Sequence, residues 1–94
     1  MNAGTEFAFY NQIQDIEFAM YVLEDNTNIQ IFTQQERARW DTAEVQFTQE
    51  NLRKGNIVTT QKFPTELKRH VFSIHATKPI IVVVFKDEMY YTIV

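Results

Sequence analysis

Hydrophobic residues in the first quarter of the chain recur at a helical spacing. Between residues 5 and 24 they are separated by four, three, four and three positions: Phe9, Ile13, Ile16, Met20 and Leu23. This spacing sets them on one side of a helix, so we predict an N-terminal helix over 5–24. Residues 18–23 are apolar at every position, as in a buried strand, so helix and strand both stay open for 16–24.

The second quarter begins with a predicted turn over 25–28 (DNTN), because Asn and Asp tolerate left-handed backbone. Ile29, Ile31 and Thr33 then alternate with other residues and predict a short strand. For 34–49 two patterns compete. Residues 33–36 (TQQE) fit a capping box that would begin a short helix through 36–40, whereas alternation over 42–49 predicts a strand.

The third quarter predicts a strand and a second helix. Residues 51–55 (NLRKG) indicate a loop, and 57–61 (IVTTQ) a strand that pairs with 42–49 as a hairpin. A helix over 64–75 follows, with Pro64 in its first turn and Pro79 beyond its end. Its apolar side would carry four residues: Phe63, Leu67, Val71 and Ile74. A strand over 71–75 is the alternative.

Residues 80–85 (IIVVVF) are apolar on both faces, which is typical of an interior strand covered by helices. A turn over 86–88 and a strand over 89–94 would complete a C-terminal β-hairpin. The 94 residues therefore predict one small α+β domain, 1–94, with two helices and a mainly antiparallel sheet of four to five strands.

Composition removes several classes of protein. The chain has no cysteine, which excludes disulfide scaffolds, thiol nucleophiles and cysteine metal sites. The first residues lack the basic start and apolar core of a signal peptide, and no 18-residue apolar stretch exists. We therefore expect a cytoplasmic protein with no membrane association.

Charge is divided unevenly along the chain. Residues 1–50 carry a net charge of −7 and residues 51–94 a net charge of +4. The acidic half supplies a candidate surface for a protein partner: Glu6, Asp15, Glu17, Glu24 and Asp25. The basic half supplies a candidate nucleic-acid-binding set: Arg53, Lys54, Lys62, Lys68, Arg69 and Lys78.

No catalytic, metal or cofactor signature accompanies these charges. With only Gly4 and Gly55, a glycine-rich phosphate loop cannot form. His70 and His75 would diverge by about 140° on a helix and could not share one ion. Ser73, the single serine, has no nucleophile-elbow context. We expect no enzyme activity and no cofactor.

The predicted order of helices and strands resembles the core of restriction-nuclease-like folds. Such enzymes use an acid on one strand and an acid-x-lysine triplet on the next to hold Mg²⁺ and position water. Neither candidate strand carries that triplet, although Asp41, Glu44 and Lys62 could assemble. The pattern favours a degenerate relative over an active nuclease.

Four segments carry a second resemblance: 16–29 (IEFAMYVLEDNTNI), 44–47 (EVQF), 64–67 (PTEL) and 79–82 (PIIV). They are similar to the C-terminal part of a domain of unknown function encoded beside restriction–modification and other phage-defence genes. The resemblance implies a strand over 17–23 and a role in mobile-element or defence biology. It implies no site residues.

These observations lead to one main functional prediction. We expect a non-catalytic protein-binding module, acting as an accessory or inhibitor in a bacterial or phage system. Its partner would be another protein, and a homodimer formed by strand pairing is a second option. The alternative is a nucleic-acid-binding or degenerate nuclease-like module that uses the basic C-terminal half.

Overall fold

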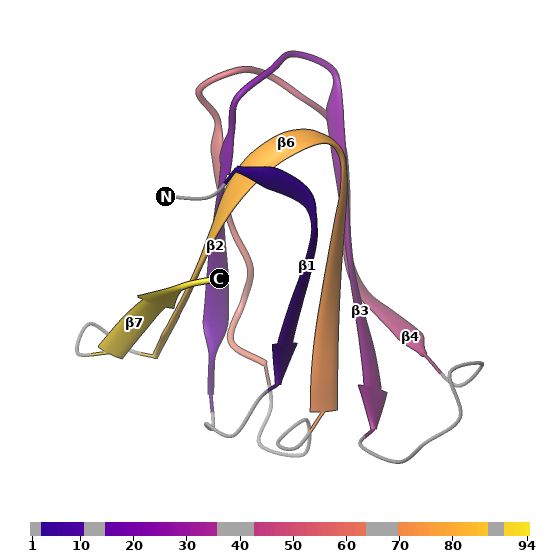
Figure 1. The fold of residues 1–94 in the computed structure, drawn as a ribbon, viewed down its shortest axis with the longest axis vertical. Helices are drawn as coiled ribbons and strands as arrows, with labels where there is room; N and C mark the ends of the chain where they lie inside the picture. The colour runs from indigo at the N-terminus through magenta and orange to yellow at the C-terminus, as the bar shows by residue number, and fades with distance from the viewer. Residues whose placement is uncertain (1–2, 11–14, 36–42, 64–69, 87–89) are drawn as a thin grey trace.

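The described part of the chain is built from β-strands alone. The computed structural model describes residues 3–10, 15–35, 43–63, 70–86 and 90–94. Seven strands form one antiparallel sheet (Figure 1): β1 Gly4–Tyr10, β2 Glu17–Val22, β3 Thr27–Gln35, β4 Glu44–Leu52, β5 Ile57–Thr59, β6 His70–Lys86 and β7 Tyr90–Ile93.

The long strand β6 organises the sheet, because it bends over and pairs differently along its two halves. Residues 70–76 pair with β3 and β1, and residues 80–86 pair with β2 and β7. Figure 1 shows β6 rising, curving over the top and descending, with β3 and β2 following it. We call β4, β3, β1 and the first half of β6 the first arm, and β5, β2, β7 and the second half of β6 the second arm.

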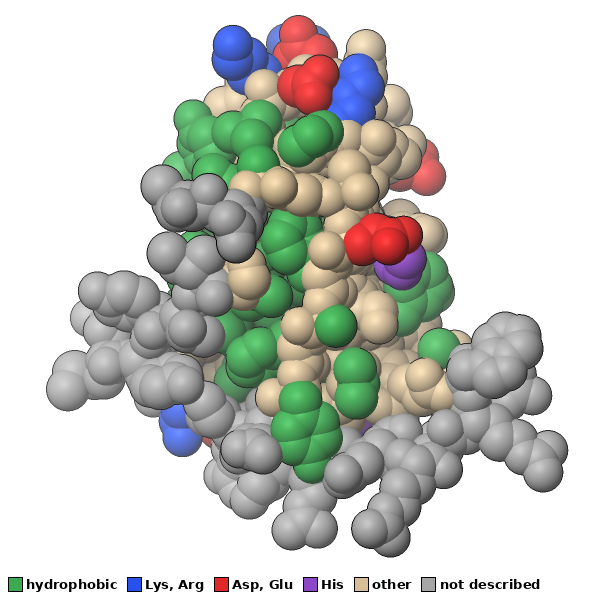
Figure 2. Space-filling model, viewed as in Figure 1, with side chains coloured by type: hydrophobic (Ala, Val, Ile, Leu, Met, Phe, Trp, Pro, Cys, Tyr) green, Lys and Arg blue, Asp and Glu red, His purple; other side chains and the backbone are tan. Residues whose placement is uncertain are grey.

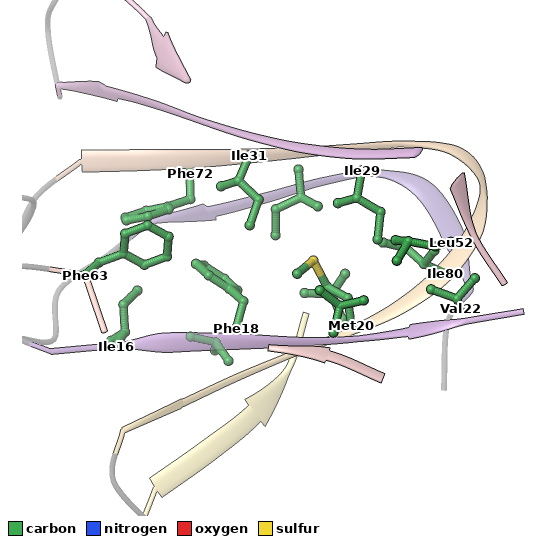
Figure 3. Close-up of a cluster of buried hydrophobic side chains, with 14 residues drawn as sticks. Ile16, Phe18, Met20, Val22, Ile29, Ile31, Leu52, Phe63, Phe72 and Ile80 are labelled. Atoms are coloured by element: carbon green, nitrogen blue, oxygen red, sulfur yellow. The ribbon is translucent and has the colours of Figure 1, made fainter. Parts of the chain in front are cut away.

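The core fills the space between the two arms. Alternate residues of β2, β3 and the two halves of β6, together with the residue before β2, point into this space and are almost fully buried: Ile16, Phe18, Met20, Val22, Ile29, Ile31, Phe72, Ile74, Ile80, Val82 and Val84. Figure 3 shows the side chains of β2 facing those of β3 and β6 across it. Antiparallel strands with one buried face produce this alternation with a period of two.

The predicted α+β class is therefore wrong, and so are both predicted helices in their described parts. Over 5–24 the chain forms β1 and β2 instead of one helix. The helical spacing included Ile16 and Met20 but omitted Phe18 and Val22, which share the same buried face. The alternative of a strand within 16–24 is confirmed.

The second predicted helix, 64–75, is contradicted over residues 70–75, the part of it that the structure describes. Residues 70–75 belong to β6, in which Phe72 and Ile74 are buried, so the alternative strand over 71–75 is confirmed. Residues 64–69 lie outside the described part of the chain. Because no helix occurs in the described residues, the strand–helix order behind the nuclease-like resemblance is not present there.

The other strand predictions have mixed outcomes. The strand at 29–33 lies within β3, the strand at 42–49 overlaps β4, and the C-terminal hairpin is confirmed by the β6–β7 pairing. The hairpin between 42–49 and 57–61 is wrong, because β4 pairs with β3 whereas β5 pairs with β2. No helix begins at Thr33, which lies inside β3; residues 36–40 are outside the described part.

Two asparagines with left-handed backbone lie at the end of the molecule where β6 bends, which we call the distal end (residues 22–28, 51–56 and 76–80). Asn26 has φ of 59° in the turn between β2 and β3, close to the predicted turn at 25–28. Asn51 has φ of 57° beside an irregularity in the β3–β4 register, and its N–H donates to Asn28 Oδ1 at 2.8 Å. Asn adopts this conformation at lower cost than most residues, which suits both positions.

A buried hydroxyl secures the segment after β5 to β2. The Phe18 N–H donates to Thr60 Oγ1 at 3.0 Å, and the Thr60 N–H donates to the Phe18 carbonyl at 2.9 Å. We expect Thr60→Val to lower the free energy of unfolding by about 1–3 kcal/mol, because it leaves a buried N–H without an acceptor. Thr59→Val, at the exposed neighbouring position, is the matched control and should have little effect. Urea denaturation followed by circular dichroism measures both, and equal losses would contradict this role.

Candidate functional site

The distal end brings oppositely charged residues together. Lys78 Nζ donates to the Asp25 carbonyl at 2.7 Å, and the Lys54 N–H donates to Asp25 Oδ1 at 3.0 Å. The turn before β5 is joined to β2 by a bond from the Gly55 N–H to the Val22 carbonyl at 2.8 Å. Figure 2 shows basic and acidic side chains intermixed at this end. The local field is therefore mixed in sign.

The candidate nucleic-acid-binding residues do not form one basic surface in the described part of the chain. Arg53, Lys54 and Lys78 lie at the distal end among acids. Lys62 lies near the opposite end of β2, because the next residue, Phe63, donates its N–H to the Ile16 carbonyl. Lys68 and Arg69 are outside the described residues.

The candidate acidic surface is also dispersed. Asp15 and Glu17 lie at the beginning of β2, whereas Glu24 and Asp25 follow its other end. Glu6 lies on β1 of the first arm, where Oε1 is 3.5 Å from His75 Nδ1. The five acids thus occupy three regions of the molecule.

The outer face of the first arm carries a polar hollow of about 260 Å³. It is open to solvent and lined mainly by polar side chains of three strands: Asn28, Gln30, Thr48, Glu50, His75 and Thr77. There His75 Nδ1 lies 3.5 Å from Glu6 Oε1, and the His75 ring makes an edge contact with the Phe32 ring, with centroids 5.6 Å apart. The hollow offers hydrogen-bonding groups to a polar ligand.

The residues examined for chemistry are not assembled into a reactive group. Five positions apart on one strand, His70 and His75 point to opposite faces of the sheet. Ser73 lies between Ala8 and Phe32 in register, neither of which is an acid or a base. Glu44 lies on the first arm and Lys62 beside the second, and Asp41 is outside the described part. Among the described residues, no three potential ligands are grouped to hold a metal ion.

The outer face of the second arm is mainly apolar, with Glu17 and Thr59 as its polar members, whereas the outer face of the first arm combines the polar hollow with exposed Tyr10 and Val45. The face of the second arm carries six nonpolar or aromatic residues, defined here as the outer apolar face: Ala19, Tyr21, Ile57, Ile81, Val83 and Phe85. Tyr21 stands between Ile57 on one neighbouring strand and Ile81 on the other. Ile57 is 69% exposed and Tyr21 42% exposed. In Figure 2, hydrophobic side chains gather at the upper left, where Figure 1 places β2 and β5.

Sequence reasoning missed this face as a site, although its signal was visible. Residues 80–85 are apolar at both alternating sets of positions, and we expected helices to cover the second set. In the structure Ile80, Val82 and Val84 fill the core, whereas Ile81 and Val83 point to the outer side, where no described helix lies.

Comparisons with known proteins add no relative. No family model, no curated protein and no solved structure matches the chain. None of the described residues forms a helix of the length and apolarity needed to cross a membrane.

Proposed function

We propose that this chain is a non-catalytic protein-binding module, an accessory or inhibitor, whose partner covers the outer apolar face. The observation that supports the proposal is the cross-strand pair of exposed Tyr21 and Ile57 beside half-buried Ile81 and Val83. The cytoplasm of a bacterium that carries a mobile element or defence system is the setting we propose for it.

The energetic argument concerns which side of the sheet meets water. An antiparallel sheet with one solvated side normally alternates between apolar residues inside and polar residues outside. The second arm breaks this rule on its outer side, and covering that side gains about 25 cal/mol for each Å² of apolar surface removed from water. Contiguous exposed apolar patches of this kind mark protein–protein contacts, and aromatic residues such as Tyr21 often contribute most of the binding energy.

The chemistry of the face favours a protein over a nucleic acid. Glu17, at the beginning of β2, is the charged residue on the same side of that strand as Ala19 and Tyr21. A phosphate backbone requires lysine and arginine side chains, and the face carries neither. A complementary partner therefore presents an apolar surface of its own.

A position-specific cross-link tests the proposal. A photoreactive phenylalanine analogue placed at Ile57 should give an adduct with a protein in the native cells. The same group at Thr48, exposed on the first arm, is the matched control and should not. Adding Tyr21→Glu to the Ile57 variant should remove the adduct, because a charge would then have to be buried in the interface. Denaturing gels and mass spectrometry detect the adducts; equal labelling from both positions would contradict the proposal.

A further inference from the structure

We infer that the partner of the outer apolar face is a second copy of this chain, bound in a two-fold, face-to-face dimer of second arms. This inference rests on the proposed function, since it identifies the occupant of the same face. A two-fold interface uses one patch on both copies, so the patch must complement itself. An apolar centre meets that condition, because apolar side chains can pack against copies of themselves.

The charges around the face fit a particular two-fold arrangement. Glu17 lies at the beginning of β2, and exposed Arg53 and Lys54 lie in the turn joined to Val22 at its other end. Five residues of strand separate these two ends by about 17 Å. A two-fold axis perpendicular to the strands places the Glu17 end of each copy over the Arg53 end of the other. The interface then has an apolar centre and places Glu17 of each copy near Arg53 of the other, at ends that also carry Lys62 and Asp25.

The size of the second arm sets the expected strength of the dimer. The strands of the second arm contain three residues in β5, six in β2, seven in the second half of β6 and four in β7. At about 4.8 Å between strands and about 3.3 Å for each residue, they cover roughly 320 Å² on each copy. This area is well below that of specific interfaces, which average about 800 Å² of accessible surface for each partner. The dimer should therefore be weak and should form only towards the upper end of the concentration range up to about 500 µM.

The main competing contact, strand addition at the β4 edge, is disfavoured by the structure. Two irregularities interrupt the β3–β4 register, and bulges of this kind protect an exposed edge. The edge also carries Glu44 and Glu50. An antiparallel pairing of two β4 strands centred on Phe47 would set these carboxylates opposite each other in both halves of the pair, which is repulsive.

Sedimentation velocity of the purified chain from about 1 to about 500 µM tests the inference. We expect a concentration-dependent dimer, and we expect Ile57→Asp to weaken it by about tenfold or more. Thr48→Asp, on the polar outer face, is the matched control and should dimerise like the parent chain. Circular dichroism verifies that each variant is folded.

A charge exchange tests the arrangement itself. Glu17→Lys should weaken the dimer, because it faces Arg53 of the second copy, and Arg53→Glu should do the same. The two substitutions together should restore most of the affinity. A chain that stays monomeric at about 500 µM, or a dimer unaffected by Ile57→Asp, would overturn the inference.

The cross-linking experiment separates this inference from the proposed function. A cross-link from position 57 to a chain of the same sequence supports both. A cross-link to a different protein overturns the dimer and leaves the protein-binding function standing. The absence of any adduct specific to position 57 overturns both.

Discussion

Replacing Phe18 with alanine is expected to lower the free energy of unfolding by about 3–5 kcal/mol. Phe18 is fully buried, and its ring contacts those of Phe9, Phe63 and Phe72, with centroids 6.0, 5.9 and 5.3 Å away. These rings come from β1, the segment after β5, and β6, so Phe18 joins three separate parts of the chain. Because the total stability of a domain is only about 5–15 kcal/mol, the variant should lose a large share of it and its melting temperature should fall by more than about 10 °C.

The matched control for Phe18→Ala is Phe32→Ala. Phe32 lies on the outer face of β3, is half-buried and contacts the ring of His75. The same number of atoms is removed, but little of the core is opened, so the loss should be about 1 kcal/mol. Chemical denaturation followed by far-ultraviolet circular dichroism measures both variants. A Phe32→Ala loss as large as that of Phe18→Ala would mean that the core does not lie between the two arms.

Local alternation made part of the fold predictable. Ile29, Ile31 and Thr33 are all buried on one side of β3, as their spacing indicated. The same alternation with a period of two holds for Ile16, Phe18, Met20 and Val22. Ile16 and Met20, however, also fit a helical spacing with apolar residues outside β2. A short apolar segment satisfies both periods, and only the packing of β2 against β6 decides between them.

Long-range pairing could not be predicted, because it depends on the path of the chain through space. Adjacent strands usually pair, yet β4 and β5 separate at the turn over 53–56 and join different arms. Pro79 was expected to follow a helix, since a proline disfavours helical backbone at the residue before it, Lys78. Instead it lies in β6 between the paired residues Ala76 and Ile80, where the strand bends and a missing N–H is tolerated.

For the candidate site, the sequence indicated that a surface had to be covered but not what covers it. The apolar residues on both sides of 80–85 indicated that both sides of this strand need cover. The inner side of residues 80–85 is covered by core residues of the opposite arm, such as Ile29 and Ile31. The outer cover was assigned to helices of the same chain, and no described residue forms one. Sequence pattern therefore reveals that a surface must be covered, but not by which molecule.

The roles of the two sides of β6 can be distinguished by making the same substitution at two neighbouring residues, one on each side. Val82 is fully buried between the arms, whereas its neighbour Val83 is half-buried on the outer side. Val82→Asp should destabilise the fold by at least about 4 kcal/mol, because it places a carboxylate in the core. Val83→Asp should cost much less stability and should instead abolish binding at the outer apolar face.

A pH series shows whether the Val82→Asp loss comes from the buried charge. Burial raises the native pKa of the new carboxyl above its unfolded value of about 3.9, so the native state binds the proton more tightly. The destabilisation should be complete above the native pKa and should shrink as the pH falls towards about 3.9. Urea denaturation at several pH values, with the parent chain as reference, measures this difference. Equal losses of stability for Val82→Asp and Val83→Asp would contradict the assignment of one side to the core and the other to a partner.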